Sequence, residues 1–151
     1  MVKDIEVFTL HRYYIWANKM RTDFDDILKR NLQKTIPNGQ FEIESNLYMS
    51  YWYAALYVVI EGWQELGLKD DKIDTLLDSP NISILRRYRN GVFHFQSDYY
   101  DERFLGFIRD GIKCVEWIRN LNLEFGRYFL SWFEQKNATK TSGNIAQTTD
   151  S

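Results

Sequence analysis

Cysteine, proline and histidine are scarce in this chain, and their scarcity excludes several classes of structure and site. The 151 residues include one cysteine, Cys114, two prolines and two histidines. A single cysteine cannot form an internal disulfide, and no Cys/His cluster has the spacing of zinc ligands. We therefore expect a protein of a reducing cytoplasm that holds no metal and no other cofactor.

No stretch of the sequence is suited to crossing a membrane. The most apolar run, residues 47–60, is interrupted by Ser50 and is shorter than the roughly 20 apolar residues of a spanning helix. The first residues lack the apolar core of a signal peptide. We expect a cytoplasmic location without a membrane partner, and a buried helix over the apolar run.

An excess of positive charge is also missing. The formal net charge is −2, so no global field draws the chain to nucleic acid. Any contact with RNA or a nucleotide must therefore be local. The densest basic cluster consists of Arg86, Arg87 and Arg89, which form either a solvated helix face or part of such a contact.

Aromatic residues, in contrast, are abundant. Phe, Tyr and Trp make up 17% of the chain and hydrophobic residues 44%, which favours one compact domain with a buried core. Apolar residues recur at helical spacing, and strand-like alternation is absent. The pattern predicts an all-α, antiparallel four-helix bundle with a short extra helix between its second and third helices.

The expected helices are bounded by recognisable turn and cap residues. The four long helices span about 4–34, 42–66, 80–96 and 102–135, and the short one about 70–77. Gly67 is placed to end the second helix, Ser79-Pro80 to begin the third, and Asp98 or Asp101 to cap the fourth. Residues 1–135 are thus the expected helical domain, and the polar residues 136–151 the expected disordered tail.

The most informative stretch is Arg89-Asn90-Gly91-Val92-Phe93-His94, in the predicted third helix. An imidazole can transfer a proton near neutral pH, and a guanidinium can hold a phosphate through paired hydrogen bonds. Together these groups indicate metal-free chemistry, or binding, at a phosphodiester.

An ideal helical projection divides the predicted third helix into two faces. The core stripe would hold Ile84, Leu85, Tyr88, Val92 and Phe95. The opposite, polar ridge would carry Arg86, Arg87, Asn90 and His94. Arg89 lies about 140° from His94, so a long side-chain reach or a distortion at Gly91 is needed to bring them together. Phe93, an aromatic residue on the polar side, indicates a surface covered by a partner subunit or a base.

Two residues outside the motif are candidates to support it. Glu61 lies in the apolar second helix and needs a partner if it is buried; Arg89 or Arg86 is the candidate, and the alternative is that Glu61 faces solvent. Tyr99 follows the motif helix and would either line a cleft or cover the edge of the core. His11, the other histidine, is expected on the surface, and Cys114 is expected to be a buried thiol.

These residues give the chain a resemblance to HEPN-type domains. The ribonucleases of that superfamily carry Arg-x(4–6)-His late in the third long helix of an all-α bundle, often with Asn, Asp or His directly after the arginine. Arg89, Asn90 and His94 match this pattern. The resemblance extends over about residues 4–135, and its most specific part lies within residues 53–107.

The resemblance implies a homodimer in which two third helices form one composite cleft. It also implies metal-independent RNA cleavage, often by a toxin with an antitoxin partner or by an antiphage effector. His94 would act as general base or acid, Arg89 would stabilise the phosphoryl oxygens, and Asn90 would orient the phosphate or the imidazole. The supporting and binding residues would be Arg86, Arg87, Glu61, Phe93 and Tyr99.

Two other functions are compatible with the same residues. Instead of cleaving RNA, the chain could be a noncatalytic dimeric module that binds a nucleotide or a partner protein, because fold does not settle function. In a third interpretation, Arg89 and His94 only stabilise the dimer. The lack of a strongly basic groove weighs against a nuclease for long RNA.

Overall fold

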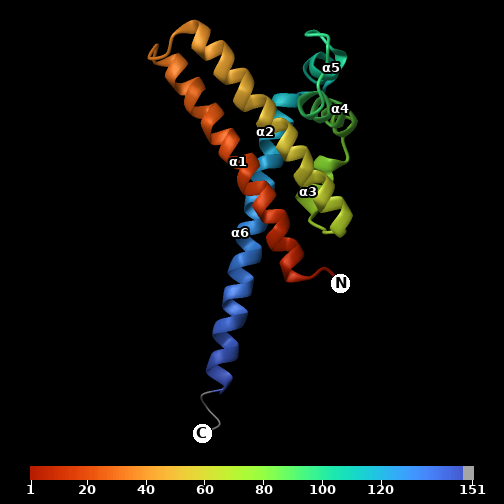
Figure 1. Ribbon diagram of the computed structural model, residues 1–151. Helices are drawn as coiled ribbons and strands as arrows, with labels where there is room; N and C mark the ends of the chain where they lie inside the picture. The colour runs from red at the N-terminus through yellow and green to blue at the C-terminus, as the bar shows by residue number, and fades with distance from the viewer. Residues whose placement is uncertain (148–151) are drawn as a thin grey trace.

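The computed structural model describes residues 1–147 as α-helices joined by short loops (Figure 1). The helices are α1 (Asp4–Leu32), α2 (Asn38–Leu66), α3 (Asp71–Leu77), α4 (Asn81–Phe93), α5 (Glu102–Asp110) and α6 (Cys114–Gln147). No strand occurs within the described residues, which confirms the predicted all-α class. None of these helices combines the length and apolarity needed to cross a membrane.

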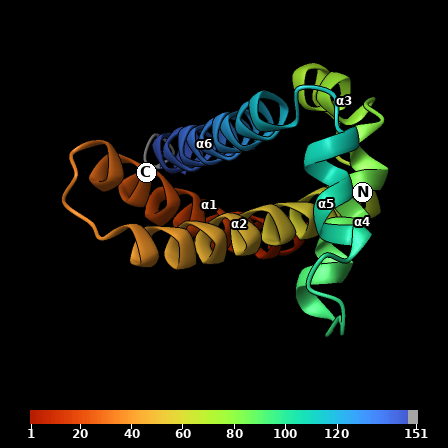
Figure 2. The same ribbon diagram turned by 90° about the horizontal axis from the view of Figure 1, so that it is seen from above.

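Helix α2 is the central element. It forms an antiparallel hairpin with α1, and on another side it packs against α4, which α5 covers (Figures 1 and 2). Its C-terminal end is fixed by Gly67, whose φ of 64° is the left-handed conformation expected of a glycine cap. This arrangement brings the motif helix α4 directly onto the most buried helix of the molecule.

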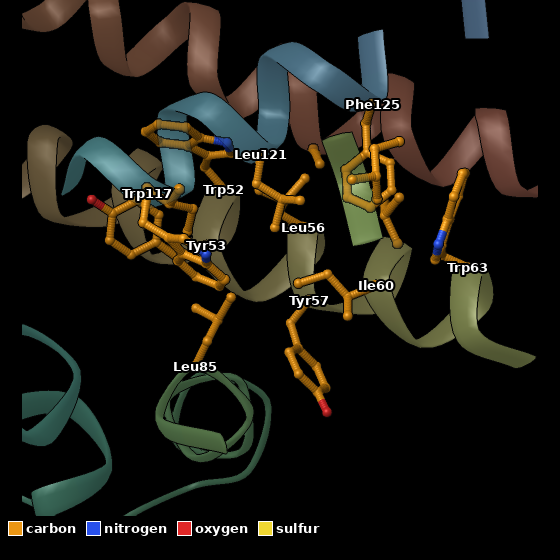
Figure 3. Close-up of a cluster of buried hydrophobic side chains, with 14 of the residues drawn as sticks. Trp52, Tyr53, Leu56, Tyr57, Ile60, Trp63, Leu85, Trp117, Leu121 and Phe125 are labelled. Carbon is orange, nitrogen blue, oxygen red and sulfur yellow. The ribbon is translucent and has the colours of Figure 1, made fainter. Parts of the chain in front are cut away.

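The core lies where α2 meets α6 and α4. Its side chains, shown in Figure 3, include Trp52, Tyr53, Leu56, Ile60, Trp63, Leu85, Leu121 and Phe125. Polar groups at this depth are paired: the indole N–H of Trp52 donates to Oδ1 of Asn122 at 3.0 Å. Burial of large aromatic surfaces is the principal stabilising contribution in such a core.

The predicted long helix over residues 102–135 is wrong, because the chain breaks between α5 and α6. Gly111 is extended there, with φ −70° and ψ 143°, and a Cβ on it would lie 2.3 Å from the carbonyl oxygen of Phe107. Asn81, which is only 1% exposed, holds the break in place. Its amide donates to the Ile112 carbonyl and accepts from the Ile112 N–H, each at 2.8 Å. The molecule therefore has two helices where the sequence predicted one.

The motif helix also ends earlier than predicted, at Phe93 instead of near Gln96. His94 has an extended backbone, with φ −124° and ψ 127°, and its N–H makes the last helical bond, to Asn90. The Gln96 side chain donates to the His94 carbonyl at 2.8 Å. This carbonyl therefore has a hydrogen-bond donor without the N–H group that a further helical turn would supply. Two placements are thereby corrected: His94 is not on a helical ridge, and Phe95 is 94% exposed rather than in the core.

At the other end, α6 continues through residues 136–147, where the sequence predicted a disordered tail. The hydroxyl groups of Thr139, Thr141 and Ser142 donate to carbonyl oxygens one turn earlier, so these polar residues are accommodated in the helix. Lys136 pairs with Asp4 of α1 at 2.8 Å. The last four residues of the predicted tail lie outside the described residues.

The environments of His11 and Cys114 settle two smaller predictions. The His11 ring lies 4.7 Å from the Phe133 ring and 5.0 Å from that of Phe129, between centroids. His11 is therefore half-buried, and the prediction of a surface histidine is corrected in part, because aromatic residues of α6 cover one side of its ring. Cys114 is buried at the start of α6, as predicted.

Candidate functional site

Arg89 of α4 forms a two-pronged ion pair with Glu61 of α2. Its Nη1 donates to Oε2 at 2.8 Å and its Nη2 to Oε1 at 3.1 Å. The guanidinium side chain is 19% exposed and the carboxylate side chain 41%. Of the two partners that the sequence suggested for Glu61, the structure selects Arg89. Glu61 itself is half-buried, between the two environments considered for it.

Two further side chains fix the orientation of the Arg89 guanidinium. Its Nε donates to Oδ1 of the neighbouring Asn90 at 2.9 Å, and its Cζ lies 4.9 Å from the centre of the Tyr57 ring, within the range of a cation–π contact. Burial and then the negative charge of Glu61 raise the pKa of the Tyr57 hydroxyl, although Arg86 and Arg89 act in the opposite sense. Tyr57 therefore remains a neutral ring beneath the guanidinium.

The ion pair leaves hydrogen-bond donors unused. A guanidinium has five N–H groups, and Arg89 uses one on each of its three nitrogens. One N–H on Nη1 and one on Nη2 have no acceptor among the described residues, and neither has the Nδ2 amide of Asn90. These groups are suited to the oxygens of a phosphate or a carboxylate, although Glu61 already balances the positive charge of Arg89.

His94 is exposed at the end of the same helix. Its backbone is tied to α4 through Asn90 and to the following loop through Gln96. Its imidazole makes no hydrogen bond with the described residues. The structure therefore ties the His94 backbone to Asn90, and no hydrogen bond joins its imidazole to Arg89.

The two remaining arginines of the cluster face different surroundings. The charge of Arg86 acts on Tyr57, so Arg86 lies on the side of α4 that carries the Glu61–Arg89 pair. Arg87 is exposed on the side of α5: the pKa of Asp110 is lowered by its hydrogen bond from Arg109 and further by the charge of Arg87. Arg86 therefore belongs with the candidate site, and Arg87 stands apart from the pair.

The aromatic candidates also separate. Phe93 is 46% exposed, and its ring lies 6.2 Å from that of Tyr51 on α2, between centroids. Tyr99 is exposed and forms an edge-on pair with Tyr100 at 5.1 Å. Tyr99 also lines a hollow of about 380 Å³ between α2, α4 and α5, so it does border a cleft. Glu61, Arg89 and His94 do not line that cleft.

Sequence reasoning overlooked Tyr57 as part of the site. The available signal was its position one helical turn before Glu61, which places both side chains on one face of α2. A groove of about 400 Å³ between α1 and α2 lies on the other side of Glu61 and is also lined by Glu6 and Glu65. The three carboxylates that line this groove repel phosphate, so an anion would have to approach Arg89 from the α4 side.

Metal ligands are not gathered at this site. Within the described residues, no three His, Cys, Asp or Glu side chains are arranged to hold a metal ion. Comparison with known proteins adds no assignment, since no family model, curated protein or solved structure matches the chain.

Proposed function

We propose that the chain is a HEPN-like endoribonuclease that acts as a homodimer and needs no metal ion. The observation that carries the proposal is a guanidinium held in a fixed orientation by Glu61 and Asn90, with an exposed histidine at the end of the same helix. Fixed hydrogen-bond donors that need no rearrangement are what stabilises developing charge in a transition state.

The reaction assigned to these groups is transfer of the phosphoryl group to the 2′-hydroxyl. A base removes the 2′-hydroxyl proton, the 2′-oxygen attacks phosphorus, and the 5′-oxygen leaves with a proton from an acid. The products are a 2′,3′-cyclic phosphate and a 5′-hydroxyl end. DNA lacks the attacking hydroxyl and is not a substrate.

A dimer supplies both proton-transfer groups. One neutral imidazole can act as base, and a protonated imidazole can act as acid, but one ring cannot do both in a single step. A two-fold axis beside α4 would place the two His94 rings on opposite sides of one phosphodiester. Arg89 and Asn90 would then donate their unused N–H groups to the phosphoryl oxygens.

The test is incubation of the purified chain with single-stranded RNA in the presence of EDTA. We expect slow cleavage with cyclic phosphate ends and none of a DNA strand of the same sequence. The His94→Ala variant should lose about 10²–10⁴-fold in rate, the usual contribution of a general acid or base. Because His94 is exposed, the variant should unfold at the same denaturant concentration as the parent chain.

Two control variants make the result specific. His11→Gln removes the other histidine, and Ser97→Ala alters the same loop as His94; both should cleave at the parent rate. Cleavage that survives His94→Ala at full rate, or that stops with EDTA, would show that the proposed chemistry is wrong.

A noncatalytic binding module is the second candidate, and one observation favours it. The carboxylate of Glu61 already occupies the Arg89 guanidinium through two hydrogen bonds, as expected of a tie between two helices. In this function the surface around α4 binds a nucleotide or a partner protein, including an antitoxin, and no RNA is cut. A pure dimer without activity, whose binding is lost in Arg86→Ala, would favour this candidate.

A further inference from the structure

A polar groove lies between α1 and α6, where these two long helices cross each other (Figure 1). Its volume is about 610 Å³, within the usual range of small-molecule sites. Its polar lining is made of arginine, asparagine and tyrosine side chains: Tyr14, Asn18, Arg21, Arg119, Asn120, Asn122 and Arg127. No carboxylate lines it, although the chain as a whole is acidic.

The floor of this groove is a hydrogen-bonded network in which the acceptors are used internally. Trp52 Nε1 donates to Asn122 Oδ1 at 3.0 Å, and Asn122 Nδ2 donates to Asn18 Oδ1 at 3.0 Å. Arg21 Nε donates to the same Asn18 oxygen at 2.9 Å. The Asn18 oxygen therefore accepts two bonds, while its Nδ2 donor has no acceptor among the described residues. Asn122 is 3% exposed, which fixes the network in the core.

The arginines are oriented by carboxylates that do not line the groove. Asp25 accepts from Arg21 Nη1 at 2.7 Å and from Arg119 Nη2 at 2.8 Å. The Arg119 guanidinium also lies 5.2 Å from the centre of the Trp52 ring. Nη2 of Arg21, and Nε and Nη1 of Arg119, have no acceptor among the described residues. Arg21 and Arg119 are thus held in place by Asp25 and still have N–H groups that can donate to a ligand.

Arg127 is held in the same way farther along the groove. It donates to Glu124 and, through Nη2, to Asp70 at 2.6 Å, and its Nη1 has no acceptor within the described part of the chain. Three arginines are therefore matched by the carboxylates of Asp25, Glu124 and Asp70. Because the charges balance, the groove attracts anions through short-range N–H hydrogen bonds and has little long-range field.

We propose that the α1–α6 groove binds a phosphorylated small molecule of about nucleotide size. Several phosphoryl oxygens close together match the N–H donors that Asn18, Arg21 and Arg119 contribute to one groove. The exposed apolar side chains of Leu123 and Leu130 provide contact for an uncharged part of the ligand. A long RNA backbone fits less well, because its affinity depends on a strip of uncompensated positive charge. The groove contains none of Glu61, Arg89 and His94, so this site is independent of the proposed catalytic one.

Calorimetric titration of the full chain with ATP, inorganic tripolyphosphate and adenosine in EDTA tests this inference. We expect ATP to bind, tripolyphosphate to bind more weakly, and adenosine not to bind. Trp52 contacts both Asn122 and Arg119, so bound ATP should also change tryptophan fluorescence, and Trp52→Phe should remove most of that change. Adenosine binding as strongly as ATP, or no binding of either phosphate compound, would overturn the proposal.

The decisive variant is Asn18→Asp, which keeps the accepting oxygen and replaces the unused N–H donor by a negatively charged oxygen. We expect it to weaken ATP binding about tenfold or more, the usual scale of a lost charge-assisted hydrogen bond. Asn31→Asp on the same helix makes the same charge change outside the groove and should bind ATP as the parent chain does. Arg119→Gln provides a second test if Asn18→Asp does not fold. Equal affinity for ATP in the parent chain and in the folded groove variants would exclude the groove as the site.

Discussion

Arg89 and Glu61 are joined by two hydrogen bonds, 2.8 and 3.1 Å long, that connect the motif helix α4 to the central helix α2. The pair lies at the boundary between core and solvent: the Arg89 side chain is 19% exposed and the Glu61 side chain 41%. Tyr57 lies beneath the guanidinium. One contact therefore both fixes the packing of α4 and orients the arginine of the candidate site, and these two roles can be separated by experiment.

Replacing Glu61 by glutamine should destabilise the fold by about 1–2 kcal/mol, between the values typical of exposed and of buried ion pairs. The reason is that the partly buried Arg89 guanidinium keeps its charge and loses its counterion. Urea denaturation of the parent chain and of Glu61→Gln measures the difference.

The matched control is Glu65→Gln, one helical turn farther along α2, where the exposed carboxylate has no ion-pair partner among the described residues. We expect that change to stay within about 0.5 kcal/mol. In an Arg89→Gln background, Glu61→Gln should also cost little, because the interaction is already absent. An equal cost in both backgrounds would mean that Glu61 stabilises the fold by some other contact.

Asn81→Ala should be strongly destabilising, by about 2–4 kcal/mol, because it leaves both backbone polar groups of Ile112 without their partner. Asn81 is almost fully buried and makes both hydrogen bonds that hold the α5–α6 break. Thermal and urea unfolding measure the effect. Asn120→Ala, an exposed asparagine of α6, is the control and should change stability by less than about 0.5 kcal/mol. A similar small value for Asn81→Ala would show that the break does not depend on this side chain.

The same break explains why the sequence predicts too few helices. Apolar spacing continues from α5 into α6, so periodicity alone favours one helix. The Asp110-Gly111 pair was the local turn signal, but the partner that fixes the turn, Asn81, lies far away in the chain. Pairings of this kind are set by tertiary packing and are not visible in local patterns. The end of α4 is a similar case, because the side chain of Gln96 replaces a further helical bond.

The candidate site was predictable in part. Glu61 stood out as a charge within an apolar helix, and that isolation is what predicted its pairing with an arginine of the motif. The position of His94 was not predictable from the helical projection, which assumes that the helix continues. The α1–α6 groove was not predicted at all, because Asn18, Arg21, Asn122 and Arg119 show no shared motif and meet only through the crossing of two long helices.

Stability should fall as the pH is lowered through the titration of His11. Burial lowers the pKa of His11 below its ordinary value of 6.5, since the ring packs near Tyr14 of α1 and the phenyl rings of Phe129 and Phe133 on α6. Above 6.5 both the folded and the unfolded chain hold a neutral imidazole, so His11 contributes no pH dependence. Below that value the unfolded chain takes up a proton more readily, and stability is lost as the pH falls.

Urea midpoints at about pH 7.5 and pH 5.5 test this effect. The parent chain should lose more stability between the two conditions than His11→Gln, whose side chain is neutral at both. Carboxylates titrate in both proteins, so their contribution cancels in the comparison. An equal loss in the parent chain and in the variant would mean that His11 is as accessible to protonation in the folded state as in the unfolded one.

The dimer proposed above should depend on the aromatic residues at the end of α4. Phe93 is 46% exposed beside Tyr51, and Phe95 is 94% exposed; together they form an apolar surface next to His94. Covering such a surface with a second copy removes it from water. Light scattering should therefore give twice the chain mass for the parent protein and the mass of one chain for Phe93→Ser with Phe95→Ser. Leu32→Ser, at an 83% exposed site distant in sequence from α4, should leave the mass at twice that of one chain.

If the double variant remains dimeric, the two-fold axis lies elsewhere and the composite cleft with two His94 rings does not form. If it becomes monomeric and folded, its RNA cleavage should fall with the dimer, because one chain supplies only one of the two proton-transfer groups.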